Sequence, residues 1–154
     1  NLSFAKGDRA RFDEARLDQA SFESGSFAEA SFAGAAGEYT ILRKAKLDRA
    51  RLGKLRLVRS IADGVEARGA DFREAWLEHT LFYEAVLEEA RFDGATLDES
   101  GFARARVARA SFAKTKARIT VWLWADIAEA DFGSADLARS FFNGCEGLRA
   151  RFRR

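Results

Sequence analysis

Residues 10–34 read ARFDE, ARLDQ, ASFES, GSFAE and ASFAG, which are five consecutive copies of one pentapeptide pattern. Each copy has a small residue in first place and a large apolar residue in third place. The register holds along the chain: of the 31 positions spaced by five from Leu2 to Phe152, 25 are Leu, Phe, Val, Ile or Trp. Small residues occupy 28 of the 30 positions two places earlier. The sequence is therefore one uninterrupted five-residue repeat.

A period of five fits neither a helix nor a simple strand. On an α-helix, successive large residues would advance by about 140° and would scatter around the whole circumference. The period fits a chain that turns a corner every five residues, with one large and one small side chain inside each side and three side chains outside.

A slower period of twenty gives the number of sides in a coil. Every twentieth residue from Ala10 to Ala150 is Ala, whereas the corresponding residues from Thr40 to Ser140 are all Thr or Ser. Phe likewise dominates one column of large positions, from Phe12 to Phe152. Four sides therefore make a coil, residues twenty apart are stacked neighbours, and the 154 residues form between seven and eight coils.

Composition narrows the class of protein. The chain has 26 Lys and Arg, 24 Asp and Glu, one Cys, one His, no Pro and no Met. Cys145 alone cannot form an internal disulfide, and no apolar run is long enough to span a bilayer. Because the sequence lacks an initiator Met and a leader, we expect residues 1–154 to be a single domain taken from a longer chain.

The repeat resembles the pentapeptide-repeat family, whose motif A-[D/N]-[L/F]-x-x is seen at residues 70–74, 130–134 and 135–139. The resemblance covers essentially the whole chain and implies an all-β fold, a right-handed quadrilateral parallel β-helix or solenoid. Such coils pair their backbones as in a parallel sheet about 4.8 Å apart. The absence of Pro agrees with this pairing, because Pro would remove an inter-coil hydrogen bond.

The net charge is close to zero because coils rich in cations alternate with coils rich in anions. We call these coils basic and acidic belts. Residues 40–59 contain eight cations and one anion, residues 100–119 contain six cations and no anion, and residues 80–99 contain six anions and one cation. The cations encircle all four sides, so we interpret them as partners in ion pairs between coils. The alternative is a weak anion or nucleic-acid site, although nucleic acid is not the partner we expect.

One side differs from the others because its outward positions are apolar. The first outward residues of this side are Ile41, Ile61, Leu81, Gly101, Val121 and Phe141, and further outward positions add Tyr83, Leu123 and Trp124. Tyr39 and Ile119 lie at the adjoining corner. An exposed apolar strip of this kind is typical of a protein-binding surface. We expect Trp124, Leu123 and Phe141 to anchor a protein partner, an adjoining domain or a second copy of the chain. The uncapped ends of the rod are a competing site of association.

The sequence contains little that could carry out chemistry. His79 is expected at an exposed corner, where a lone His is usually a surface residue, and Cys145 falls among the small inward residues. We expect no catalytic residues, no metal and no cofactor, so the protein is not predicted to be an enzyme.

The function predicted from these features is a non-catalytic rigid scaffold or protein-interaction module. The family resemblance implies an alternative, a DNA mimic that binds a type II topoisomerase such as gyrase, but that role needs a continuous acidic stripe, which the basic belts interrupt. The resemblance also implies a bacterial source. It further implies a cytoplasmic location or export as part of a secretion-system effector or adaptor.

Overall fold

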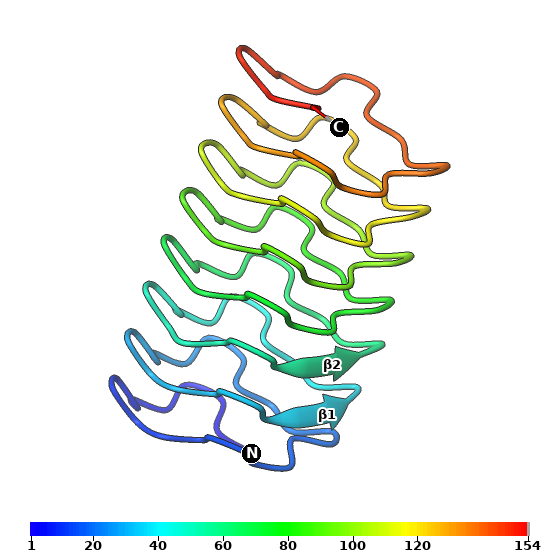
Figure 1. Cartoon of the computed structure of the whole chain (residues 1–154). Helices are drawn as coiled ribbons and strands as arrows, with labels where there is room; N and C mark the ends of the chain where they lie inside the picture. The colour runs from blue at the N-terminus through cyan, green and yellow to red at the C-terminus, as the bar shows by residue number, and fades with distance from the viewer. Residues whose placement is uncertain (154) are drawn as a thin grey trace.

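The computed structural model describes residues 1–153, which wind into a stack of four-sided coils with the two termini at opposite ends (Figure 1). Strand β1 (Ala36–Glu38) and strand β2 (Arg56–Val58) lie on successive coils and pair in parallel, with Ala36 opposite Arg56. The predicted all-β, right-handed quadrilateral β-helix is confirmed. No helix able to cross a membrane occurs among residues 1–153.

Backbone bonds between coils hold the stack together. Outside β1 and β2, each side contributes one parallel bridge to the residue twenty places along, such as Arg11 to Ser31 and Ser31 to Arg51. The amide N–H of Phe12 donates to the carbonyl of Ser31 at 2.7 Å, and the N–H of Ser31 donates to the carbonyl of Ala10 at 2.9 Å. The twenty-residue spacing of these bridges confirms four sides per coil.

The corners are tight turns with a left-handed residue. The residue two places after each large position, from Phe4 to Arg149, has φ between +50° and +71°, and 25 of these 30 residues are not Gly. The following N–H bonds back to the large residue, as from Ala5 to Leu2 at 3.1 Å. This combination is typical of a type II turn.

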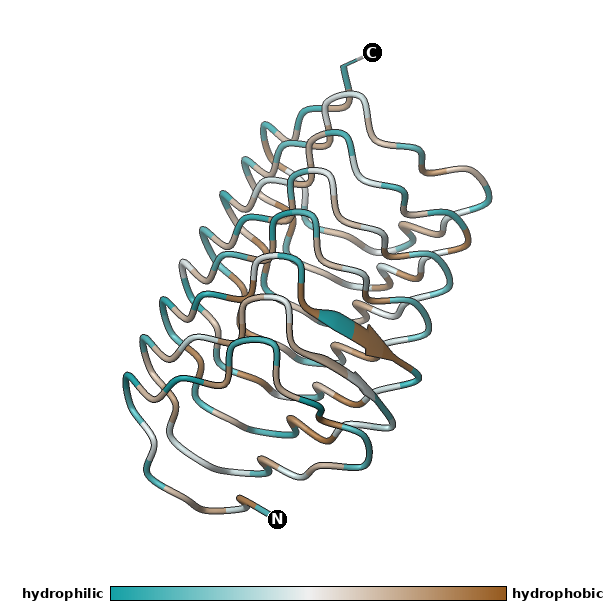
Figure 2. Cartoon of the chain, turned by 60° about the horizontal axis from the view of Figure 1, so that its bottom comes forward, coloured by the Kyte–Doolittle hydropathy of each residue, from teal (hydrophilic) through white to brown (hydrophobic). Residues whose placement is uncertain are grey.

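Stacked rings fill the axis of the rod. Phe72, Phe92, Phe112 and Phe132 follow one another with ring centroids 4.5, 4.8 and 5.0 Å apart and nearly parallel planes. Rings from the other Phe column meet them edge to face, so each ring has both kinds of aromatic neighbour. Hydrophobic and hydrophilic residues alternate along the coils (Figure 2).

At one corner, hydroxyl side chains replace backbone hydrogen bonds. They come from the column of Thr and Ser residues from Thr40 to Ser140, which we call the hydroxyl column. In alternate coils the N–H of Thr donates to the Ser hydroxyl of the next coil, as from Thr80 to Ser100 at 3.2 Å. The Ser100 hydroxyl in turn donates to the Leu77 carbonyl at 2.6 Å. Thr40 and Thr120 make the same amide bond, to Ser60 and Ser140. Buried backbone groups at this corner are thus satisfied by side chains.

Candidate protein-interaction surface

The apolar side is built on one continuous column of bridges. Parallel bridges connect Ile41, Ile61, Leu81, Gly101, Val121 and Phe141 in that order. Leu81 is 46% exposed and Phe141 is 53% exposed, whereas Ile41, Ile61 and Val121 are half-buried. The structure therefore brings these predicted residues together. We call this column, with Tyr83, Leu123 and Trp124, the apolar strip.

The aromatic part of the strip is held in place by its neighbours. The Arg104 guanidinium carbon lies 5.8 Å from the ring centroid of Tyr83 and 5.8 Å from that of Trp124. The Trp124 indole also lies against Gly144, where a Cβ would come within 2.4 Å of it. Trp124 nevertheless remains 62% exposed, whereas Leu123 is half-buried. Of these two predicted anchors, Trp124 offers the larger accessible surface.

A hollow of about 470 Å³ interrupts the middle of the strip. We call it the notch. Its lining residues are Asp63, Leu81, Tyr83, Glu99, Ser100, Gly101, Ala103 and Val121. Leu81 and Tyr83 precede the small residues Gly101 and Ala103 by one coil, and Val121 follows by one coil. The notch therefore lies where one coil lacks the large outward side chains of its neighbours.

Two carboxylates border the notch. Asp63 accepts a hydrogen bond from the N–H of Tyr83 at 3.2 Å. Glu99 lies 3.5 Å from Nδ1 of His79. Among the described residues that line the notch there is no Lys or Arg. The nearby Arg104 is paired with Glu84 at 3.6 Å. The notch is thus apolar at its walls and acidic at its border.

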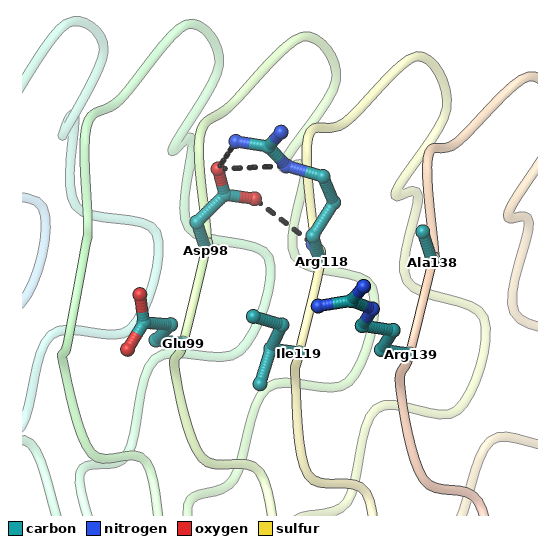
Figure 3. Close-up of a pocket in the computed structure, with 6 residues that line it drawn as sticks. All are labelled: Asp98, Glu99, Arg118, Ile119, Ala138 and Arg139. Atoms are coloured by element: carbon teal, nitrogen blue, oxygen red, sulfur yellow. Dashed lines mark hydrogen bonds and ion pairs between the residues drawn. The ribbon is translucent and has the colours of Figure 1, made fainter.

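The corner beside the strip contains a second hollow, of about 380 Å³. Figure 3 shows Asp98 and Arg118 facing one another across two coils, with a shortest distance of 2.6 Å. Glu99, Ile119 and Arg139 follow in three successive coils, and Glu99 also borders the notch. Ile119 is exposed, as is Tyr39 in the same column. The two predicted corner residues are thus exposed beside the strip, but Arg59, His79 and Glu99 separate them in their column.

The two basic belts differ in how their charges are paired. In residues 100–119, four of the six cations have a carboxylate within 4.0 Å: Arg104, Arg106, Arg109 and Arg118. In residues 40–59, only Arg43 and Lys54 of the eight cations have such a partner among the described residues. The predicted ion pairing is confirmed for most of the second belt and is wrong for most of the first. Residues twenty away from the unpaired cations are often small or neutral, such as Ser24 and Gly64 beside Lys44.

Acidic side chains do not form a stripe along the rod. No outward column has Asp or Glu in more than two successive coils, as at Asp18 and Glu38. Several of these acids instead bond within the rod. The hydrogen bond from the Ser31 hydroxyl, and the bond from the Ala33 N–H at 3.1 Å, lower the pKa of Asp13. These carboxylates act as backbone caps between coils.

The two side chains that could act in catalysis, His79 and Cys145, make contacts with neighbouring coils. His79 contacts Glu99 at the exposed corner. The thiol of Cys145 donates to the Trp122 carbonyl at 2.7 Å, and burial raises its pKa. Within residues 1–153, no three His, Cys, Asp or Glu side chains cluster as metal ligands would.

The missed features of this surface are the small and acidic residues. Sequence reasoning assigned the apolar strip but did not recognise Gly101 and Ala103 as a hollow, nor Asp63 and Glu99 as its border. Comparing side-chain sizes down the columns at steps of twenty could have found the hollow, because Gly101 lies between Leu81 and Val121. The acids are harder to find, since they come from neighbouring columns.

Comparison with known structures gives the fold. QnrB1, a plasmid-mediated fluoroquinolone resistance protein, is similar at full length with a TM-score of 0.56 and 13% identity, covering 92% of this chain and 88% of that one. A trypsin-treated R167E form of QnrB1 gives a TM-score of 0.54 and 14% identity, with 96% and 86% covered. HetL from the cyanobacterium Nostoc sp. strain PCC 7120 gives a TM-score of 0.40 and 20% identity, covering 94% of this chain and 81% of that one.

Comparison with protein families gives a match to pentapeptide repeats in eight copies, over residues 15–53 and 68–102. No curated protein matches the chain. The same register continues outside the matched residues, and the coils there have the same bridges and turns. Residues 15–53 and 68–102 therefore carry the repeats of the pentapeptide-repeat family.

Proposed function

We propose that this protein is a rigid scaffold that binds a protein segment through the apolar strip. The observation that supports this most is the continuous column from Ile41 to Phe141, with exposed Leu81, Tyr83 and Trp124 beside it. Exposed apolar side chains that gather along one side of a protein often mark a surface that meets a partner. Trp124 is already held against Arg104 and Gly144, so little ordering is needed on binding.

A peptide selection tests this function. A displayed library of random peptides is selected on the protein and then screened against a Leu81→Ser, Trp124→Ser double variant. Trp76→Ser is the matched control, because Trp76 is also exposed but lies in a different column. Selected peptides are expected to lose at least about tenfold in affinity for the double variant and to keep their affinity for the control. Equal binding to all three proteins would contradict the proposal.

The occupant belongs to another chain, to an adjoining domain or to a second copy. Sedimentation velocity tests whether the occupant is a second copy. A dimer of the original protein that becomes a monomer in the double variant would identify a second copy as the occupant. We also propose that the module works within a longer bacterial chain, in the cytoplasm or exported with a secretion system. The family resemblance alone supports this placement, and the sequence of the parent chain tests it.

A second candidate function is anion binding by the first basic belt. Its support is the unpaired state of most of these cations, including Arg49 and Arg51, which line a hollow of about 590 Å³ with Arg9 and Glu29. Binding of heparin that weakens steeply with salt and is lost in Arg49→Ala, Arg51→Ala would support it. Retention of heparin binding in that variant would contradict it.

A further inference from the structure

Gly101 is unusual in the apolar strip because the backbone does not require a glycine there. Its φ does not lie in the left-handed region, and a Cβ added to it would meet only the Cδ2 of Leu81, at 3.3 Å. Leu81 is exposed and can rotate away. The equivalent residues of the neighbouring coils, Leu81 and Val121, carry full side chains. The missing side chain therefore leaves space for an atom group from outside.

The shape of the notch favours one large apolar side chain. Gly101 and the methyl group of Ala103 lie between the larger side chains of Leu81, Tyr83 and Val121. The backbone at this point is already paired, since Gly101 donates to the Thr80 carbonyl at 3.1 Å and accepts from the Phe82 N–H at 2.7 Å. A partner therefore cannot add a strand here, and recognition must come from its side chains.

The border of the notch determines the charge that the partner should carry. Asp63 has no cation within 4.0 Å among the described residues, and Glu99 has only His79, at 3.5 Å. A second copy placed on the same strip would bring two more copies of these carboxylates toward the same interface. A segment with basic residues beside its apolar side chain would instead meet opposite charges.

We propose that the notch receives one Phe or Leu side chain of a partner segment in which Lys or Arg flanks that residue. This inference rests on the proposed function and names the chemistry of the partner. The apolar side chain occupies the space above Gly101, and the flanking cations lie near Asp63 and Glu99.

Three capped peptides test the proposal by NMR titration of the ¹⁵N-labelled protein: Ala-Arg-Phe-Arg-Ala, Ala-Glu-Phe-Glu-Ala and Ala-Arg-Ala-Arg-Ala. The first is expected to shift the Gly101 amide and to bind at least about fivefold more tightly than either of the others. Equal affinity for the first two peptides, or no binding of the first, would overturn the proposal.

Variants of the notch separate shape from charge. Gly101→Val places a side chain already used in this column in the space above position 101 and should weaken the preference for Phe, whereas Thr96→Val, at the equivalent position of another side, should not. Asp63→Asn with Glu99→Gln keeps an acceptor for the Tyr83 N–H and should equalise the Arg and Glu peptides. An unchanged preference in both notch variants would contradict the assignment.

The peptide selection distinguishes failure of this inference from failure of the proposed function. Selected peptides that need Leu81 and Trp124 but show no enrichment of Lys or Arg beside Phe or Leu would overturn the inference and leave the proposed function standing. Selected peptides that bind the double variant as well as the original protein would overturn both.

Discussion

Two sides of the same rod share one pattern of backbone bridges between coils but have opposite surfaces. On the apolar strip, the bridged column contains Ile41, Ile61, Leu81 and Val121. On another side the bridged column runs Arg51, Asp71, Arg91, Ser111, Asp131 and Arg151. There Arg73 pairs with Asp71 at 2.6 Å, so the side chains bond to one another. Because bridges and core hold both sides, the outward residues are free to differ in function.

The largest effect on stability is expected from a substitution in the core, because both sides pack against the same buried rings. Phe92 is fully buried and stacks on Phe72 and Phe112. Phe92→Ala should lower the free energy of unfolding by about 3–5 kcal/mol, because it removes a large buried side chain and leaves a cavity. Chemical denaturation measures this, with the exposed Leu81→Ala as control. A loss no larger than that of the control would contradict the shared core.

The next effect concerns the corner that leads into the strip. Ser100→Ala removes the acceptor of the buried Thr80 N–H and the donor to the Leu77 carbonyl. It should cost about 1–3 kcal/mol of unfolding free energy, since a buried N–H is left without a partner. Ser111→Ala on the charged side should cost less, because the Ser111 hydroxyl bonds to Asp93 in a more exposed setting. Equal losses would show that the hydroxyl column has no special role.

A smaller effect separates paired from unpaired cations. Arg118 binds the mostly buried Asp98 at 2.6 Å, but its own side chain is largely exposed. Arg118→Ala should therefore cost up to about 1 kcal/mol, whereas Lys44→Ala should cost almost nothing. Thermal or chemical unfolding of both variants measures the difference. A larger loss for Lys44→Ala would mean that the first belt is stabilising in a way the ion pairs do not explain.

The smallest effect is a pH dependence carried by the charged sides. Hydrogen bonds from Ser31 to Asp13 and from Arg73 to Asp71 hold the pKa of each carboxyl below 3.8 in the folded protein. Their contribution is complete above the unfolded value and is lost as the pH falls through the lower folded value. Unfolding measured in steps below about pH 5 should show this decline. Asp13→Asn with Asp71→Asn should flatten it, and an unchanged slope would contradict this origin.

The repeat made most of the fold predictable, because five-residue and twenty-residue periods have one simple geometric solution. The column from Ile41 to Phe141 followed directly from that spacing. The hydrogen bond from Thr80 to Ser100 could not be predicted in this way, because a column of hydroxyl residues does not reveal which group donates to which acceptor. Pairing also depends on side-chain reach: Arg118 finds Asp98, but Lys44 has Ser24 and Gly64 as its column neighbours.

The most direct test of the account is a map of where a selected peptide binds. Amide chemical shifts of the ¹⁵N-labelled protein are recorded with and without a peptide from the library. The account predicts the largest changes along the apolar strip, at Leu81, Gly101 and Val121, with little change at Arg51 or Asp71. Changes centred on the column of Arg51, with the strip unaffected, would contradict it.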